Sequence, residues 1–429
     1  MKIEKENKPL NMSKFIVKKA KAETLSQADY NAIVKHMMAF GVDKHTKNMF
    51  LALDKFGMTK EEVLYLALAI RDSGKVFHAN EVVLEKHSTG GIGDSTSIVL
   101  IPLLSSLGYK IVKTTGKSLV FANGSADRFK AIPGFEPMEY SQINKALAKN
   151  NACILAHGEE YCPADSILYS IIEKYHLESN INFLAASIVA KKLTSDARIV
   201  LVDVKYGEAS AIDKYDQACK LAALLKYMFA ECGVECIIAL TNTHQLIGES
   251  VGNAVEVVDA LDVLNGKHNA LREVSIAYAV EMMIKVDKRL NKKDAYDMCV
   301  TALDGGLAYR HFLDIVKTQH GDVTAVKNRT FFEPKETIVF KADRDGYVGN
   351  VNALLMGELI RRLCAETHNC NIGLHLNVRI GDYVKKGDTI LTLYCESKNS
   401  VKKYIEAIRG CVRLTQVKVK RINPIKRLG

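Results

Sequence analysis

The sequence predicts an α/β protein with a small, discontinuous all-helical domain, a large α/β domain with a mixed, mostly parallel sheet, and a β-rich C-terminal module. Three observations lead to this fold class. Short apolar runs alternate with helical patterns through the middle of the chain, which is typical of a parallel sheet covered by helices. Helical periodicity without strands fills residues from about 25 to 75 and returns at Ala164. From about residue 336, short strand patterns are separated by glycines.

Helix starts and strand patterns set the predicted boundaries. Ser26 and Thr59 stand where N-caps are expected, ahead of apolar stripes at helical spacing. Runs such as Ile199–Val202 are apolar throughout, as in a strand buried on both faces. The predicted parts are 1–77 and 161–195 for the helical domain, 78–160 and 196–335 for the α/β domain, and 336–429 for the C-terminal α+β module.

Composition favours a soluble intracellular protein. The chain has 429 residues, of which 48% are hydrophobic and 25% charged, so it can bury a large core. Its 10 cysteines lack the spacing of a disulfide framework, which indicates free thiols in a reducing compartment. No signal-like N-terminus and no apolar run of about 18 residues is present. We therefore expect a cytoplasmic location and no membrane partner.

The net charge of +10 is concentrated near the C-terminus, where residues 401–429 hold nine Lys or Arg against one acid, Glu406. Such a tail can bind nucleic acid. However, polar and apolar residues alternate from Arg413 to Ile422, and no aromatic stacking module accompanies the charge. The pattern favours an edge strand protected by lysines, so we expect no nucleic-acid partner.

The stretch Lys86–Asp94 combines glycines with polar groups between a predicted strand and a predicted helix. Three glycines within four positions let backbone N–H groups approach an anion closely, and the helix presents its N-terminus there. Lys86 adds positive charge, while Ser88 and Ser97 add hydroxyl donors. The sequence therefore predicts a phosphate-binding loop rather than a plain turn.

Two further segments follow the next strand: Lys113–Ser118 and Asn123–Ser125. Neighbouring parallel strands end at the same edge of a sheet, so the three segments are expected to converge on one anion. The spacing fits neither a Walker A loop nor a dinucleotide fingerprint.

These residues resemble the thymidine phosphorylase and pyrimidine-nucleoside phosphorylase family. Lys86–Asp94 matches the family's K-H-S-T-G-G-x-G-D in full. The resemblance runs from about residue 14 to 410. Further agreement lies in Ile132–Phe135, Pro163–Asp165, Ala186–Ile188, Ala190–Lys192, Asp203–Lys205, Val251–Ala254 and Gly381–Gly387.

The resemblance implies that phosphate attacks C1′ of a pyrimidine nucleoside, releasing the base and a (deoxy)ribose 1-phosphate. Domain closure would bring phosphate and nucleoside together, with inorganic phosphate as co-substrate and no cofactor required. His87 and Lys191 would be catalytic, and Ser187 and Lys191 would bind the base. The implied phosphate-binding residues are Lys86, Ser88, Ser97, Lys113, Thr115 and Ser125.

The resemblance also implies a homodimer formed through the helical domain. Some relatives hold a structural potassium ion, which gives a possible potassium site here. The matching positions are Gly93, Ser95, Ile247, Ser250 and Asp259.

The chain departs from the family pattern in three places. Ile172 stands where the family has a base-binding Arg, and Ile offers none of the planar hydrogen bonds of a guanidinium. Phe121-Ala122-Asn123 replaces H-T-G, and Tyr206–Ala211 differs from the family's G-x-G-A-F. Two alternatives follow: a weak or inactive paralogue with an altered base pocket, and a phosphoribosyltransferase-like enzyme, although no acidic magnesium-binding segment is seen.

Other candidate sites are better explained by ordinary surface structure. Cys364, His368 and Cys370 fit no standard zinc spacing. The adjacent pair Glu159-Glu160 is expected to point apart in a turn. His244 follows a strand in a polar loop, where a site role and a structural role are equally open. Lys174 or His176 could replace the missing Arg from one turn away.

Overall fold

A computed structural model describes residues 10–79, 81–115, 124–156, 160–367 and 371–429. The chain folds into two compact units. The first comprises Met1–Glu81, His157–Val200 and Cys219–Cys236, and the second comprises Val82–Ala156, Leu201–Ala218 and Ile237–Gly429. The C-terminal sheets thus fall in the same unit as the α/β core.

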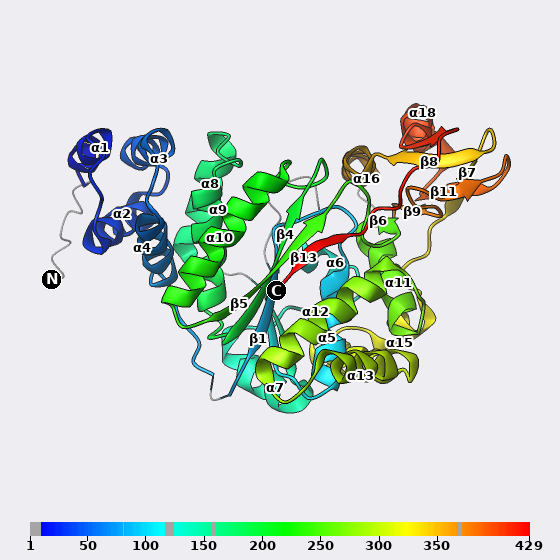
Figure 1. Cartoon of the computed structure of the whole chain (residues 1–429), viewed down its shortest axis with the longest axis horizontal. Coiled ribbons are helices and arrows are strands. Elements are labelled where there is room, and N and C mark those ends of the chain that lie inside the picture. The colour runs from blue at the N-terminus through cyan, green and yellow to red at the C-terminus, as the bar shows by residue number, and fades with distance from the viewer. Residues whose placement is uncertain (1–9, 80, 116–123, 157–159, 368–370) are drawn as a thin grey trace. The chain divides into compact units, whose positions relative to one another are not determined.

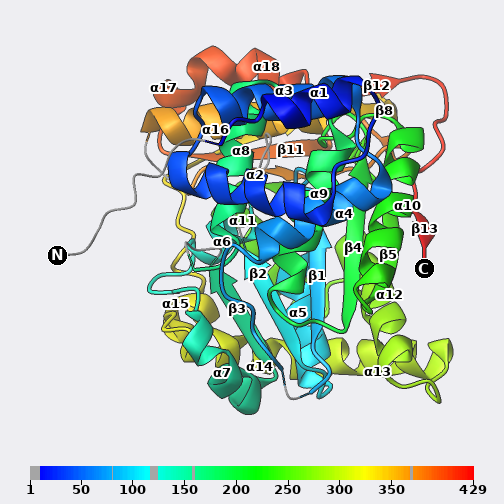
Figure 2. The same ribbon diagram turned by 90° about the vertical axis from the view of Figure 1, so that its left-hand side faces the viewer.

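The first unit is helical (Figure 2). The predicted caps are confirmed, because Ser26 and Thr59 each form a capping box at the start of a helix. Helix α4 packs against α9 and α2, and α8 packs against α9. The helices are α1 (Ser13–Ala20), α2 (Gln27–Phe40), α3 (Lys44–Phe56), α4 (Lys60–Arg71), α8 (Pro163–Lys174), α9 (Ile181–Leu193) and most of α10 (Tyr215–Glu231).

The main sheet has six strands in the order β13-β5-β4-β1-β2-β3, which confirms the predicted α/β class. β1 pairs with β2 and β2 with β3 in parallel, whereas β13 runs antiparallel to β5 at the edge (Figure 1). The strands are β1 (Leu84–Ser88), β2 (Ile111–Thr115), β3 (Ala152–Ala156), β4 (Ile199–Tyr206), β5 (Glu235–Asn242) and β13 (Ile425–Leu428).

Helix α5 (Thr96–Ser106) is buried nearly all round, as its apolar sequence requires. It packs against α12 and α14 as well as β2. The other helices of this part are α6 (Ser125–Phe129), η1 (Tyr140–Gln142), α7 (Ile143–Asn150), α11 (Asn253–Leu264), α12 (Ala270–Val286), α13 (Lys292–Asp304), α14 (Leu307–Thr318) and α15 (Val323–Asn328).

The predicted C-terminal strands are present in two small sheets, ordered β6-β9-β11-β7 and β10-β8-β12. Around them lie α16 (Ala353–Thr367), α17 (Lys398–Val401), η2 (Lys402–Tyr404) and α18 (Ile405–Arg409). The strands are β6 (Ser250–Val251), β7 (Glu336–Lys341), β8 (Gly346–Val351), β9 (Gly373–Leu376), β10 (Tyr383–Val384), β11 (Thr389–Cys395) and β12 (Val412–Thr415).

The predicted edge strand from Arg413 to Ile422 is too long. β12 ends at Thr415, because its partner β8 begins at Gly346 and Thr415 already pairs with Tyr347. Among the described helices, none is long and apolar enough to cross a membrane.

Candidate functional site

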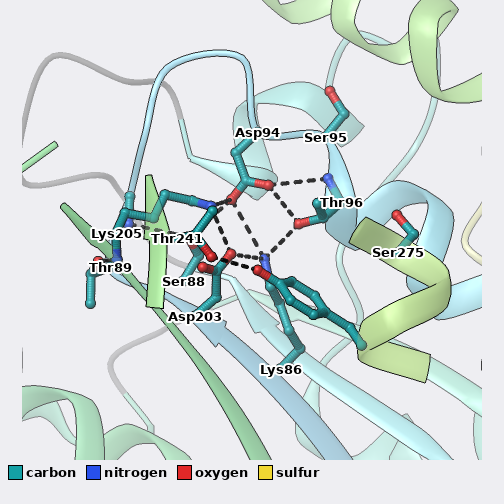
Figure 3. Close-up of polar contacts among 12 residues, drawn as sticks. Lys86, Ser88, Thr89, Asp94, Ser95, Thr96, Asp203, Lys205, Thr241 and Ser275 are labelled. Carbon is teal, nitrogen blue, oxygen red and sulfur yellow. Dashed lines mark hydrogen bonds and ion pairs between the residues drawn. The ribbon is translucent and has the colours of Figure 1, made fainter. Parts of the chain in front are cut away.

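The loop between β1 and α5 forms the centre of the predicted anion site in the second unit (Figure 3). Gly90 and Gly93 have φ angles of 93° and 66°, in the left-handed region that favours glycine. Gly91 lies directly over a lysine from β4, since a Cβ added there would be 2.5 Å from Lys205 Cδ. The glycine spacing is therefore required by this backbone path.

Beneath the loop, two lysines and two aspartates form a buried network. Lys205 Nζ lies 2.7 Å from Asp203 Oδ2 and 3.3 Å from Asp94 Oδ2. Lys86 Nζ lies 3.5 Å from the same Asp94 oxygen and 3.6 Å from that of Asp203. All four side chains are buried, and their formal charges cancel.

Electrostatics keep Asp94 and Lys205 ionised. Burial opposes the charge on Asp94, but Lys205 and Lys86 outweigh it and hold the pKa of Asp94 well below its ordinary value. Burial likewise opposes the charge on Lys205, and Asp203 and Asp94 raise its pKa despite this. At neutral pH, Asp94 is therefore a carboxylate and Lys205 an ammonium.

Hydroxyl groups attach the network to the loop. Lys86 Nζ donates to Thr96 Oγ1 at 2.8 Å, and Thr96 Oγ1 donates to Asp94 Oδ1 at 2.5 Å. Ser88 Oγ donates to Asp94 Oδ2 at 2.9 Å. Ser97 follows in the first turn of α5 and is buried. His87 lies between Lys86 and Ser88 on β1 and is half-buried.

The second predicted segment lies at the end of β2, beside β1. Lys113 is buried, and its Nζ donates to the carbonyl of Thr114 at 3.1 Å. Thr115 Oγ1 donates to the carbonyl of Leu155 at 2.7 Å. Ser88 and Thr115 are the last residues of adjacent parallel strands, so they share one edge of the sheet.

The third segment is described only from Gly124, because residues 116–123, including Phe121-Ala122-Asn123, lie outside the described residues. Ser125 is the first residue of α6 and is half-buried. Arg128 of the same helix forms a buried ion pair with Glu256 of α11. Ser95 Oγ donates to Glu256 Oε2 at 3.4 Å. Glu256 thus connects α6 to the start of α5.

The possible potassium positions cluster around the loop that follows β5. The Gly93 carbonyl accepts a bond from Gly248 N–H at 3.1 Å. Asp259 Oδ2 accepts one from Glu249 N–H at 2.7 Å, while its buried Oδ1 has no hydrogen-bond partner among the described residues. Burial raises the pKa of Asp259 to about 7. A buried carboxylate oxygen without a donor fits a monovalent cation.

The other positions of this set already have polar neighbours. Ser250 Oγ lies 3.1 Å from His375 Nδ1, and the Ile247 carbonyl lies 3.5 Å from Arg379 Nη1. Within the described part of the chain, no group of three or more His, Cys, Asp or Glu residues could hold a metal ion. Of the five predicted potassium positions, Asp259 carries the acidic side chain.

The predicted base-binding residues lie in the first unit, on α9 and beside α8. Lys191 Nζ donates to Ser187 Oγ at 2.7 Å, to Asp165 Oδ2 at 2.9 Å and to Tyr169 Oη at 3.0 Å. Burial opposes the charge of Lys191, but Asp165 and Tyr169 raise its pKa. An ammonium has three protons, so these three acceptors use them all.

Ile172, on α8, is 2% exposed. Lys174 is exposed and lies over the ring of Tyr175, with Nζ 5.7 Å from the ring centroid. His176 is also exposed, just beyond the end of the helix. Neither therefore shares the buried position of Ile172.

The remaining candidates show ordinary surface contacts. His244 is exposed, and Glu160 pairs with Lys75 at 3.0 Å. Glu159, His368 and Cys370 lie outside the described residues.

Sequence reasoning missed the residues that hold the predicted ones in place. Asp203 and Lys205 belong to the D-V-K motif, and Asp165 to P-A-D, so the signal was present without an assigned role. Arg128 and Glu256 gave no local signal, because each is meaningful only through a partner more than a hundred residues away.

Comparisons with known proteins place the chain in a family. A family model described as "Glycosyl transferase family, a/b domain" matches residues 80–309, and "Pyrimidine nucleoside phosphorylase C-terminal domain" matches residues 347–415. The chain is 26% identical to a thymidine phosphorylase of Mycoplasmoides pirum, covering 90% of this chain and 95% of the relative. It is 28% identical to a pyrimidine-nucleoside phosphorylase of Staphylococcus haemolyticus, covering 93% and 96%.

A solved structure shares the fold. It is anthranilate phosphoribosyltransferase from Thermus thermophilus, with a TM-score of 0.55 and 16% sequence identity. The match covers 70% of this chain and 98% of that one. At this identity the likeness concerns the fold alone.

Proposed function

The chain belongs to the glycosyl transferase family defined by the a/b domain, and on this basis we propose that it is a pentosyltransferase acting on a pyrimidine nucleoside. The reaction is phosphorolysis, which yields the free base and ribose 1-phosphate or deoxyribose 1-phosphate. The observation that carries the proposal is the glycine-rich loop whose Asp94 contacts buried Lys86 and Lys205, in a chain whose relatives are named thymidine and pyrimidine-nucleoside phosphorylases.

The phosphate half of the reaction fits the chemistry of the second unit. A phosphate oxygen forms a bond to C1′ while the C1′–N bond breaks, and the electron pair leaves with the base nitrogen. Positive charge develops on the sugar in the transition state, where a bound phosphate stabilises it. The residues proposed to hold that phosphate are Lys86, Ser88, Ser97, Lys113, Thr115 and Ser125.

The base half requires stabilisation of a leaving anion. Lys191 gives all its protons to resident acceptors, so Ser187 and Tyr169 hydroxyls that accept from it keep their own protons to donate to a base carbonyl. His87 is the proposed proton donor to the base. Ser187 and Lys191 thus act together as the base-binding pair.

A second candidate function is favoured by one observation. Ile172 is buried and apolar where relatives of this kind would place a base-binding Arg. A chain of this type with an intact phosphate loop and a weakened base pocket would turn over slowly or prefer another base. This candidate and the main proposal share the phosphate site and differ only in nucleoside turnover.

Assembly, ion binding and location are part of the same proposal. Exposed apolar side chains Val17, Met38, Phe40 and Phe56 of the first unit support a homodimer formed through these helices. Potassium would be held by Asp259 with Gly93, Ser95, Ile247 and Ser250, and would brace the loop after β5. The nine described cysteines are free thiols, in keeping with a cytoplasmic location.

The test is phosphorolysis of a panel containing thymidine, uridine, deoxyuridine, cytidine and purine nucleosides, with and without phosphate. Free base and sugar 1-phosphate are measured. We expect phosphate-dependent release from uridine or thymidine. Release only from other nucleosides would indicate a switched base pocket, and no release with phosphate still bound would overturn the assignment in favour of a non-catalytic paralogue.

A further inference from the structure

We infer that Lys205 is a positioning residue of the phosphate site. It stays paired with Asp94 and Asp203, which leaves the Lys86 ammonium free to move toward a bound phosphate. The inference rests on the proposed function, because it concerns the same phosphate loop. Lys86 and Lys205 face the same two carboxylates, those of Asp94 and Asp203 (Figure 3). Each lysine therefore reaches both carboxylates, so both carboxylates keep a cationic partner when Lys86 turns away.

The distances separate the roles of the two lysines. Lys205 Nζ is the closer partner of both carboxylates, at 2.7 Å and 3.3 Å. Lys86 Nζ stands at 3.5 Å and 3.6 Å, and its close contact is the neutral hydroxyl of Thr96 at 2.8 Å. Lys86 can therefore leave the carboxylates at a smaller electrostatic cost than Lys205, because the attraction between opposite charges weakens with distance.

The backbone around Lys205 also shapes the loop. Lys205 N–H donates to Thr89 Oγ1 at 2.9 Å, and Thr89 N–H donates to the Asp203 carbonyl at 3.0 Å. The methylene stem of Lys205 fills the space under Gly91. β4 thus holds the first half of the loop through its backbone, and the Lys205 side chain supports the middle.

Burial prevents water from taking over the role of Lys205. Lys205 and Asp203 are fully buried. Behind them, the buried Tyr278 hydroxyl lies 2.8 Å from Thr241 Oγ1, and burial together with the charge of Asp203 raises the pKa of Tyr278 well above its ordinary value. Tyr278 stays a neutral phenol and supplies no charge. If Lys205 is removed, Lys86 is the remaining cation within reach of both carboxylates in the described network.

The experiment compares the full-length protein with Lys205→Met, which keeps the apolar stem under Gly91 and removes the charge. Phosphate binding is measured by calorimetry, and KM for phosphate and for nucleoside is measured separately. We expect phosphate affinity to fall about tenfold to a hundredfold, the range for losing one buried charged hydrogen bond. The KM for nucleoside should change less than about twofold.

Two further variants separate charge compensation from loss of folding. Lys205→Met with Asp203→Asn removes one cation and one carboxylate, so it should recover most of the phosphate affinity. Lys19→Met breaks the buried Lys19–Glu62 pair of the first unit, 2.8 Å apart, and should lower stability without changing phosphate affinity. The melting temperature of every variant is recorded.

The outcomes distinguish this inference from the proposed function. If the unaltered protein does not bind phosphate, both fail. If it binds phosphate and Lys205→Met binds equally well, the counter-cation role is wrong and the phosphate site stands. If the double variant binds phosphate no better than Lys205→Met while both fold, the loss of affinity does not come from an uncompensated carboxylate and the inference is overturned.

Discussion

The two lysine clusters of this protein are built differently. In the second unit, Lys86 and Lys205 share Asp94 and Asp203, so one cation can leave without stranding a carboxylate. In the first unit, Lys191 contacts Asp165, Tyr169 and Ser187, and these three acceptors use its three protons. From this difference we expect phosphate to be bound by redirecting a lysine, and a base to be bound through hydroxyls that a lysine polarises.

The largest expected effect is that of replacing Asp94 in the phosphate-site network. Asp94→Asn leaves two buried lysines facing one carboxylate, and breaking a buried ion pair costs about 3–5 kcal/mol. We expect the free energy of unfolding in urea to fall by that amount and phosphate binding to be lost. Asp127→Ala, which removes a cap bond from Gly124 N–H, is the control and should cost about 1 kcal/mol. Equal effects of the two variants would contradict the network.

Acid should weaken the same cluster. Burial opposes the Asp94 charge, yet Lys205 and Lys86 depress the pKa of Asp94 below its ordinary value of 3.8. A depressed carboxylate pKa stabilises the fold fully above the unfolded value, and this is lost as pH falls through the folded value. The difference in unfolding free energy between the unaltered protein and Asp94→Asn should be constant above about pH 5 and shrink below about pH 4. A difference independent of pH would show that folding leaves the pKa of Asp94 unchanged, which would contradict the network.

Placing an arginine at position 172 tests the proposed base-binding site of the first unit. Ile172→Arg should lower KM for a pyrimidine nucleoside about tenfold or more, because a charged hydrogen bond contributes about 1.5–3 kcal/mol. KM for phosphate should not change. Ile171→Arg is the matched control: both isoleucines are buried, so both variants should lose stability, and only Ile172→Arg should lower KM for the nucleoside. If both variants behave alike, position 172 does not face the base.

Truncating a hydroxyl should give a smaller effect. Ser187→Ala removes one acceptor of Lys191 and one donor to the base, so KM for nucleoside should rise about fivefold, for about 1 kcal/mol. Ser195→Ala removes a local bond to the Lys192 carbonyl and serves as control. Unchanged KM in Ser187→Ala would place base recognition elsewhere.

The smallest expected effect concerns potassium. At about five times its Kd, potassium should add about 1 kcal/mol to stability. The melting temperature is compared in potassium chloride and choline chloride at equal ionic strength, and Asp259→Asn should abolish the difference. A difference that survives Asp259→Asn would place the ion elsewhere or reflect ionic strength alone.

The sequence allowed much of this fold to be predicted because the signals were local. Ser26 and Thr59 cap helices three residues ahead of their partners, and the glycines of the loop follow from its backbone angles. Lys86 and Ser88 were found because they stand beside those glycines. These patterns need no knowledge of distant residues.

Long-range partners could not be found in this way. Lys205 reaches Thr89 across 116 residues of chain, and nothing near either residue shows that they meet. The strand from Arg413 was predicted too long for the same reason, since its end depends on where β8 begins. Spacing could show that Ile172 replaces an Arg, but its burial required the structure.

The first unit, which contains Asp165, Ser187 and Lys191, is assembled from three separate stretches of chain. One of its boundaries falls between Val200 and Leu201, inside strand β4. No single segment of the gene encodes it. One contiguous exchange of gene sequence therefore cannot replace the first unit while leaving the second unchanged. Under the proposed function, we therefore expect changes of base preference to arise by individual replacements, such as the isoleucine at position 172.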